Sequence, residues 1–143
     1  YWNVKTKIGK PLRHIHKPVI SLNKKIGSRI ETFIKQSPLK KPFARQNWLI
    51  HGDTKRFHLS EEDSLETNPS SWFIRSEKET ICRFHEDFSL FTINVIFQPL
   101  SAIHNFPKAK KGLQKSLDIL DANEVSYFGG TKKINLIKDY LRI

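Results

Sequence analysis

Apolar residues recur at two different spacings along this chain, and each spacing predicts a different kind of element. Between residues 22 and 34, leucine, isoleucine and phenylalanine recur at helical spacing and form one apolar stripe. Ser21 precedes the stripe as a suitable N-cap, and Pro38 follows it as a residue that ends helices. The pattern therefore predicts a helix between Ser21 and Pro38.

Beyond residue 42 the pattern becomes that of β-strands. Aromatic and β-branched residues are frequent in 43–51, 72–84 and 88–98, so we expect a strand in each segment. The short polar segment 85–87 predicts that the last two strands form an antiparallel hairpin, whereas 59–71 reads as an exposed loop. One alternating apolar row in the last strand is expected to face the helices; its members are Phe91, Ile93, Val95 and Phe97.

Two further helices are expected after the strands. Pro107 suits the first position of a helix, Asn123 ends that helix, and the turn at 127–130 precedes the last one. The order of one helix, three strands and two helices predicts a single α+β domain over residues 1–143, with an antiparallel sheet flanked by helices. The expected inward residues are Phe106, Ala109, Leu113, Leu117 and Leu120 in the first of these helices, and Ile134, Ile137 and Leu141 in the second.

The chain is strongly basic, since 25 lysines and arginines against 14 acidic residues give a net charge of +11. This balance favours anionic partners, namely nucleic acid, an acidic protein face or a membrane surface. Aromatic residues do not alternate with the basic ones as a base-stacking platform requires. A solvated surface and a functional basic surface therefore both stay open. The basic stretches are Lys5–Lys17, Lys24–Arg29, Lys35–Arg45 and Lys108–Lys115.

Other features of the composition narrow the class of protein. The single cysteine, Cys82, excludes a disulfide framework and a cysteine-based zinc site within this chain, and it fits a reducing compartment. No apolar stretch approaches the ~20 residues of a membrane-spanning helix. Because the sequence begins with Tyr1 and Trp2 rather than methionine, we expect that a preceding portion of the protein is missing.

Two pairs of residues are candidates for chemistry. His14 and His16 are two positions apart, so on an extended chain they point the same way, as a metal pair or as two surface histidines. The predicted strand 72–84 also carries Arg75, Glu77, Lys78, Glu79 and Arg83, which fit a solvated sheet face with cross-strand ion pairs. Alternatively, Arg75 and Glu77, which share one face, point into a pocket. The sequence contains no nucleophile signature, phosphate-binding loop or zinc-protease motif.

A series of short motifs, taken in order, resembles one enzyme family. The chain is similar to the alpha subunits of haem-dependent oxidative N-demethylases of the dimethylamine monooxygenase type. The matching motifs are Trp2, the Lys-x-Gly-x-x-Leu stretch at 7–12, Ile-His-x-Pro-Val at 15–19, Arg-x-Asn-Trp at 45–48, the strand 75–83, Phe-Thr-Ile at 91–93 and the turn at 127–129.

The resemblance implies a PAS-like fold that binds haem b and removes methyl groups from secondary amines with molecular oxygen, releasing formaldehyde. In the family, electrons arrive from NADPH through reductase subunits. By position in the motif, His16 is the expected iron ligand. Arg45 and Arg75 suit the haem propionates, because a guanidinium pairs with a carboxylate through two hydrogen bonds. Glu77 is expected to hold the ammonium group of the substrate.

The chain also departs from the family pattern. It has Lys78-Glu79 where the family has Arg-Gln, Asn94 where the family has Arg, and 20–22 reads Ile-Ser-Leu instead of Pro-Gly-Tyr. These changes weaken or remove cations near the presumed pocket. The resemblance spans about the second half of a typical member, so we expect the chain to be the C-terminal part of a longer PAS-like haem domain.

The departures and the charge support an alternative function. A diverged, non-catalytic relative would serve as a basic structural subunit of a larger organellar or RNA-containing assembly. In that case Lys24–Arg45 and Lys108–Lys115 would contact acidic protein or phosphate. The sequence leaves a cytoplasmic and a mitochondrial location equally open.

Overall fold

A computed structural model describes residues 4–6, 8–10, 20–56 and 68–143 of the chain, with the backbone alone for 20–26. The described residues form two compact units. Unit 1 contains the described residues of 1–47 and residues 77–94, whereas unit 2 contains 48–56, the described residues of 62–76 and 95–143. The elements are α2 (Ile20–Gln36), β1 (Phe43–His51), β2 (Phe73–Arg83), β3 (Ser89–Pro99), α3 (Pro107–Asp118), α4 (Ala122–Tyr127) and α5 (Gly130–Arg142), with single turns of 3-10 helix at Val4–Thr6 and Pro69–Ser71 and a longer one at Leu100–Asn105.

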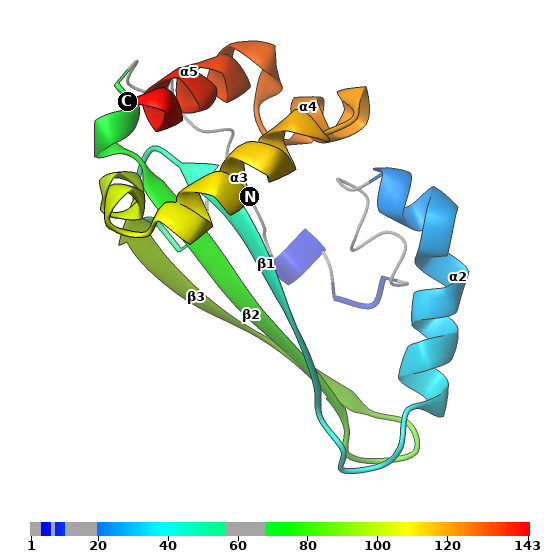
Figure 1. Ribbon diagram of the computed structural model, residues 1–143. Coiled ribbons are helices and arrows are strands. Elements are labelled where there is room, and N and C mark those ends of the chain that lie inside the picture. The colour runs from blue at the N-terminus through cyan, green and yellow to red at the C-terminus, as the bar shows by residue number, and fades with distance from the viewer. Residues whose placement is uncertain (1–3, 7, 11–19, 57–67) are drawn as a thin grey trace. The chain divides into compact units, whose positions relative to one another are not determined.

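The strands form one three-stranded antiparallel sheet in the order β1-β2-β3 (Figure 1). Each strand lies within about a residue of its predicted bounds, and the predicted hairpin of the last two strands is confirmed. Helix α2 begins at Ile20 and ends at Gln36, two residues before the proline that the pattern predicts as its end. The fold is therefore α+β, with a sheet flanked by helices, and it is PAS-like as expected.

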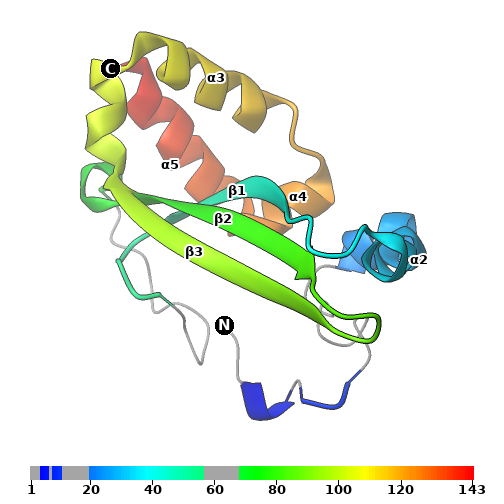
Figure 2. The ribbon, with the colours of Figure 1, turned by 90° about the horizontal axis from the view of Figure 1, so that it is seen from below.

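The hydrogen bonds at the two ends of the hairpin define the register of β2 and β3. The backbone N–H of Phe84 donates to the carbonyl of Phe88 at one end, and that of Leu100 donates to Trp72 at the other. Both bonds belong to the same register, which places odd-numbered residues of β3 on the same face as odd-numbered residues of β2. Figure 2 shows the three strands side by side.

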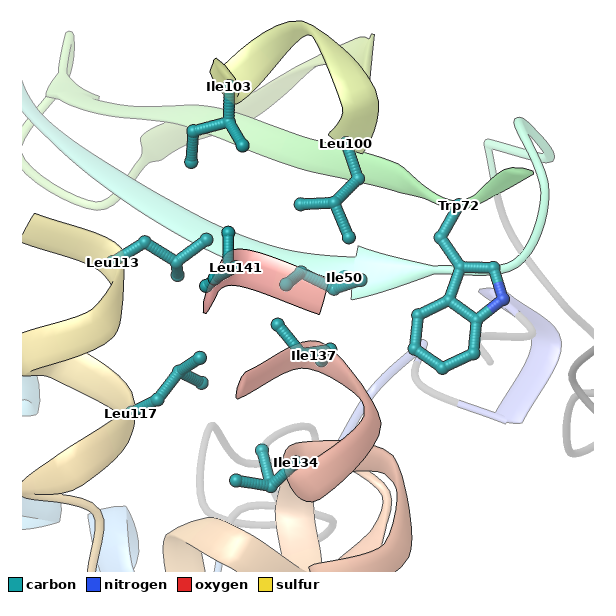
Figure 3. Packing of buried hydrophobic residues seen from close by; sticks show 9 residues of the cluster. All are labelled: Ile50, Trp72, Leu100, Ile103, Leu113, Leu117, Ile134, Ile137 and Leu141. Atoms are coloured by element: carbon teal, nitrogen blue, oxygen red, sulfur yellow. The ribbon is translucent and has the colours of Figure 1, made fainter. Parts of the chain in front are cut away.

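The hydrophobic core of unit 2 lies between the sheet and the last helices (Figure 3). Ile137 and Leu141 of α5 are completely buried, as the sequence predicts. Burying each such side chain stabilises the fold by roughly 1.5–3 kcal/mol. The side chain of Gln114 on α3 donates to the Leu141 carbonyl at 3.0 Å and joins the two helices. The cluster consists of Ile50, Trp72, Leu100, Ile103, Leu113, Leu117, Ile134, Ile137 and Leu141.

A buried lysine links α5 to strand β1 inside unit 2. Lys133 is 9% exposed, and its Nζ donates to the carbonyl of Ile50 at 2.6 Å. Its side chain passes beside Gly129, whose φ of 104° lies in the left-handed region. A Cβ on Gly129 would lie 2.8 Å from Cδ of Lys133. Glycine is therefore required at this turn both for backbone freedom and for space.

Two expectations about buried side chains are wrong. In unit 2, Ile74 packs against the core, so Phe97, on the face of the odd-numbered residues, points away from α3 and α5. The predicted orientation is therefore wrong for Phe97, and the apolar surface under the helices of unit 2 comes instead from Trp72, Ile74 and Leu100. Phe106 is 61% exposed and Ala109 is exposed as well, so the buried stripe of α3 narrows to Leu113 and Leu117.

Helix α4 is an element that the hydrophobic pattern does not predict. Asp121 caps it, accepting hydrogen bonds from the backbone of Asn123 and Glu124, while the Glu124 carboxylate accepts from the backbone N–H of Asp121. This reciprocal arrangement is a capping box, which satisfies donors that have no partner inside the helix.

Within the described ranges, no helix is both long enough and apolar enough to span a bilayer.

Candidate functional site on the sheet of unit 1

An ion pair between neighbouring strands stands at the centre of the candidate site. Nε of Arg45 on β1 donates to Oε2 of Glu79 on β2. The Glu79 side chain is 8% exposed, whereas that of Arg45 is 62% exposed. A buried carboxylate is unfavourable unless a cation or hydrogen-bond donors compensate it. Arg45 supplies that compensation through Nε, while most of its side chain stays exposed.

A second buried carboxylate lies beside the first on the same strand. Glu77 is 8% exposed and accepts a hydrogen bond of 3.4 Å from Nδ2 of Asn47 on β1. Because Glu77 and Glu79 are two positions apart on β2, their side chains share one face of the sheet, and Lys78 between them is exposed. Glu77 is therefore buried and hydrogen-bonded on this face, not exposed.

An apolar strip borders the two carboxylates. The register places Ile93 of β3 opposite Glu79 and Phe91 opposite Ile81, on the same face. Phe91 and Ile93 are each 49% exposed, although both belong to a sheet. This face of unit 1 therefore combines half-exposed apolar side chains with fixed carboxylates and a surface guanidinium.

Arg75 lies in unit 2 and has its own partner. The side chain is half-buried, and its Nη2 donates to the carbonyl of Arg56 at 3.2 Å. His16, the expected iron ligand, and His14 lie outside the described residues. In the ranges that the structure covers, no group of three or more His, Cys, Asp or Glu side chains is arranged to hold a metal ion.

The departures from the family pattern fall mainly on the other face of the sheet. Lys78 and Asn94 lie opposite each other in the register and are both exposed, on the face away from Glu77. Neither change therefore removes a cation from the face that carries Glu77. At position 79 the family has glutamine, and the glutamate of this chain is the residue that binds Arg45.

Sequence reasoning named Arg45 and Glu77 as site residues, missed Asn47, and considered Glu79 only as part of a solvated face with cross-strand ion pairs. Glu79 was a departure from a motif, and its spacing of two from Glu77 was the signal that both carboxylates share a face. The spacing of two also places Asn47 on the same face of its strand as Arg45. A spacing of two does not indicate which face of the sheet is covered by the rest of the protein. Burial of a carboxylate depends on that covering.

The fold and this face describe a PAS-like α+β domain whose sheet carries two buried carboxylates beside an arginine and an apolar strip. The sequence matches the family model described as haem-dependent oxidative N-demethylase, alpha subunit-like, over residues 1–137. The chain belongs to this family. A search of the curated proteins finds no match to the chain.

Proposed function

We propose that this chain is a haem-binding, oxidoreductase-like domain of the oxidative N-demethylase type, and that it forms the C-terminal part of a longer PAS-like haem domain. The observation that carries the proposal is the face of unit 1, where Glu77 and Glu79 are buried beside Arg45 and an apolar strip. Membership of the family over residues 1–137 supports the same function, because the name of the family describes a haem-dependent demethylase.

The described residues fit the chemistry of a haem. A haem b has a flat apolar ring, for which the half-exposed Phe91 and Ile93 offer a surface, and two propionates, which guanidinium groups bind well. Arg45 uses Nε for Glu79 and has its Nη nitrogens for a propionate, and Arg75 is the second candidate. His16 would hold the haem iron. Bound in this way, haem b would supply the oxidation of a methyl group by molecular oxygen.

Glu77 is the proposed substrate-binding and catalytic residue. A secondary amine is protonated near neutral pH, and a buried carboxylate attracts an ammonium group much more strongly than an exposed one does. Asn47 holds the carboxylate of Glu77 through its side-chain amide. Glu77 would therefore orient the amine on the sheet and hold its charge, while the apolar strip excludes water from the methyl groups.

The proposed partners are reductase subunits that deliver electrons from NADPH. The family is described as alpha subunit-like, which implies an assembly of several subunits.

The test uses the full-length protein reconstituted with haem. The wild type is expected to show a Soret band, and His16→Ala should abolish or shift it, since the residue that holds the iron would control its electronic state. His14→Ala is the matched control and should leave the band unchanged. Glu77→Gln should keep the band but lose the spectral shift that dimethylamine causes. If the wild type takes up no haem, the enzymatic function is refuted.

A further inference from the structure

Helix α3 of unit 2 carries a stripe of exposed lysines along one side. Lys108, Lys111 and Lys115 are spaced by three and four positions, so they lie on the same helical face over about 10 Å. All three are exposed. We call this face the lysine stripe.

The lysine stripe has no counter-charge in the part of the chain that the structure describes. No carboxylate there lies within ion-pair distance of these three side chains, and the nearby Asp118 is already bound by Lys138 at 2.7 Å. The first turn of α3 contains no acidic residue and Phe106 provides no side-chain cap, although a helix N-terminus favours negative charge. Lys108 in the first turn is therefore unfavourable for the helix dipole, whereas Lys115 in the last turn is favourable for it. The three like charges repel one another, and an anionic partner would relieve that repulsion and compensate Lys108.

The opposite side of α3 holds the stripe in place. Leu113 and Leu117 are buried in the core of unit 2, and Gln114 donates to the Leu141 carbonyl. The lysines are therefore presented from a fixed backbone. A partner that binds them does not have to order the helix, and this lowers the entropic cost of association.

Two apolar features adjoin the stripe and indicate what kind of anion it fits. Ile119, which ends the helix on the same side, is 82% exposed. Gly112 lies within the stripe, and a Cβ built on it would meet no atom within 4 Å, so the helix backbone is open to close approach there. Protein interfaces combine such apolar contacts with a charged rim.

We infer that the lysine stripe, with Gly112 and Ile119, is the docking surface for an acidic protein partner that places an apolar side chain against α3. Nucleic acid fits less well. Three lysines neutralise few phosphates, and phosphate gains nothing from the exposed isoleucine. A single helix face gives a small interface of the kind found in transient, charge-steered complexes. This inference does not depend on haem binding.

The test measures binding of the whole protein to four probes by fluorescence anisotropy. The probes are an amphipathic acidic peptide with an apolar stripe, an all-glutamate peptide, a short DNA duplex and phosphatidylserine vesicles. The charge reversal Lys108→Glu/Lys111→Glu/Lys115→Glu is compared with a matched reversal on unit 1, Lys35→Glu/Lys40→Glu/Lys41→Glu. Both triples change the net charge equally, so only position differs between them.

The α3 reversal should weaken binding of the amphipathic acidic peptide roughly tenfold, whereas the unit 1 reversal should change it less than about twofold. Ile119→Ser should weaken binding of the amphipathic peptide and leave binding of the all-glutamate peptide unchanged. Equal losses for both triples would refute a specific site. If DNA or vesicles bind more tightly than the acidic peptides, and the α3 reversal weakens that binding, the stripe binds nucleic acid or membranes and the proposal of an acidic protein partner is wrong. In both triples, the lysines are also replaced by glutamine, so that a loss of binding is not confused with an effect of charge reversal on folding. The Soret band of the same variants is recorded as well, because haem binding is expected to be the same whether or not the acidic peptide binds.

Discussion

At the scale of single residues, the turn before α5 shows how a glycine and a buried lysine depend on each other. Lys133 crosses from α5 to the Ile50 carbonyl only because Gly129 leaves room for its side chain. We expect Gly129→Ala to destabilise the protein by about 1–3 kcal/mol, from the left-handed backbone and the displaced lysine. Urea unfolding measures this change.

Gly112→Ala is the control for that substitution. Gly112 lies inside α3 with open space around it, so alanine should stabilise the helix by about 0.5–1 kcal/mol. The two glycine-to-alanine changes should therefore shift stability in opposite directions. If both variants lose stability, the destabilisation by Gly129→Ala cannot be attributed to the lack of space around Gly129.

The ion pair of the candidate site makes a second residue-scale prediction. Arg45→Ala leaves the carboxylate of Glu79 buried without its cation, which should cost on the order of 1–2 kcal/mol, with solvent around the exposed arginine limiting the loss. Glu79→Gln removes the charge instead and should cost less than about 1 kcal/mol. The double variant should be more stable than Arg45→Ala alone. Strictly additive effects in the unfolding free energy would contradict the pairing.

The candidate residues were accessible from sequence to different degrees. Arg45 and Glu77 were named because their motifs resemble those of a family, and both lie on the face of unit 1 that carries the site. Their burial was not predictable, since a period of two assigns residues to faces without saying which face is covered. The role of His16 stays a prediction.

At the scale of elements, strands and helices followed from local patterns, whereas their orientation did not. The strands were predicted closely because aromatic and β-branched residues cluster between clear turn signals. Phe97 of the β3 row was assigned to the wrong face, because the helices of unit 2 pack against Trp72, Ile74 and Leu100. Only tertiary packing determines that choice.

Helix α4 was missed because its signal is a cap rather than an apolar stripe. Asp121 and Glu124 have the spacing of a capping box, which a search for apolar periodicity overlooks. We expect Asp121→Ala to cost about 1 kcal/mol in the free energy of unfolding, because two backbone donors lose their acceptor. Asp121→Asn should retain most of the stability, since asparagine also caps helices. Equal losses for the two variants would argue against capping.

At the scale of the whole molecule, the net charge of +11 acts on any polyanion regardless of where the charges lie. We therefore expect the wild type to bind a short DNA duplex weakly, with a dissociation constant of roughly 10⁻⁴–10⁻⁶ M at physiological salt. Affinity should fall steeply as salt increases, because each neutralised phosphate releases a counterion.

Charge reversal separates this general attraction from specific docking. Replacing three lysines by glutamates lowers the net charge by six, from +11 to +5, whether the change is made on α3 or at Lys35, Lys40 and Lys41. Both reversals should weaken DNA binding to a similar extent and flatten its salt dependence similarly, because non-specific binding follows total charge. Titrations at several salt concentrations measure both slopes. A DNA affinity that responds to only one of the reversals would mean that the protein has a defined nucleic-acid site on that helix or turn. A binding constant that does not change with salt would show that the basic surface is not what holds the duplex.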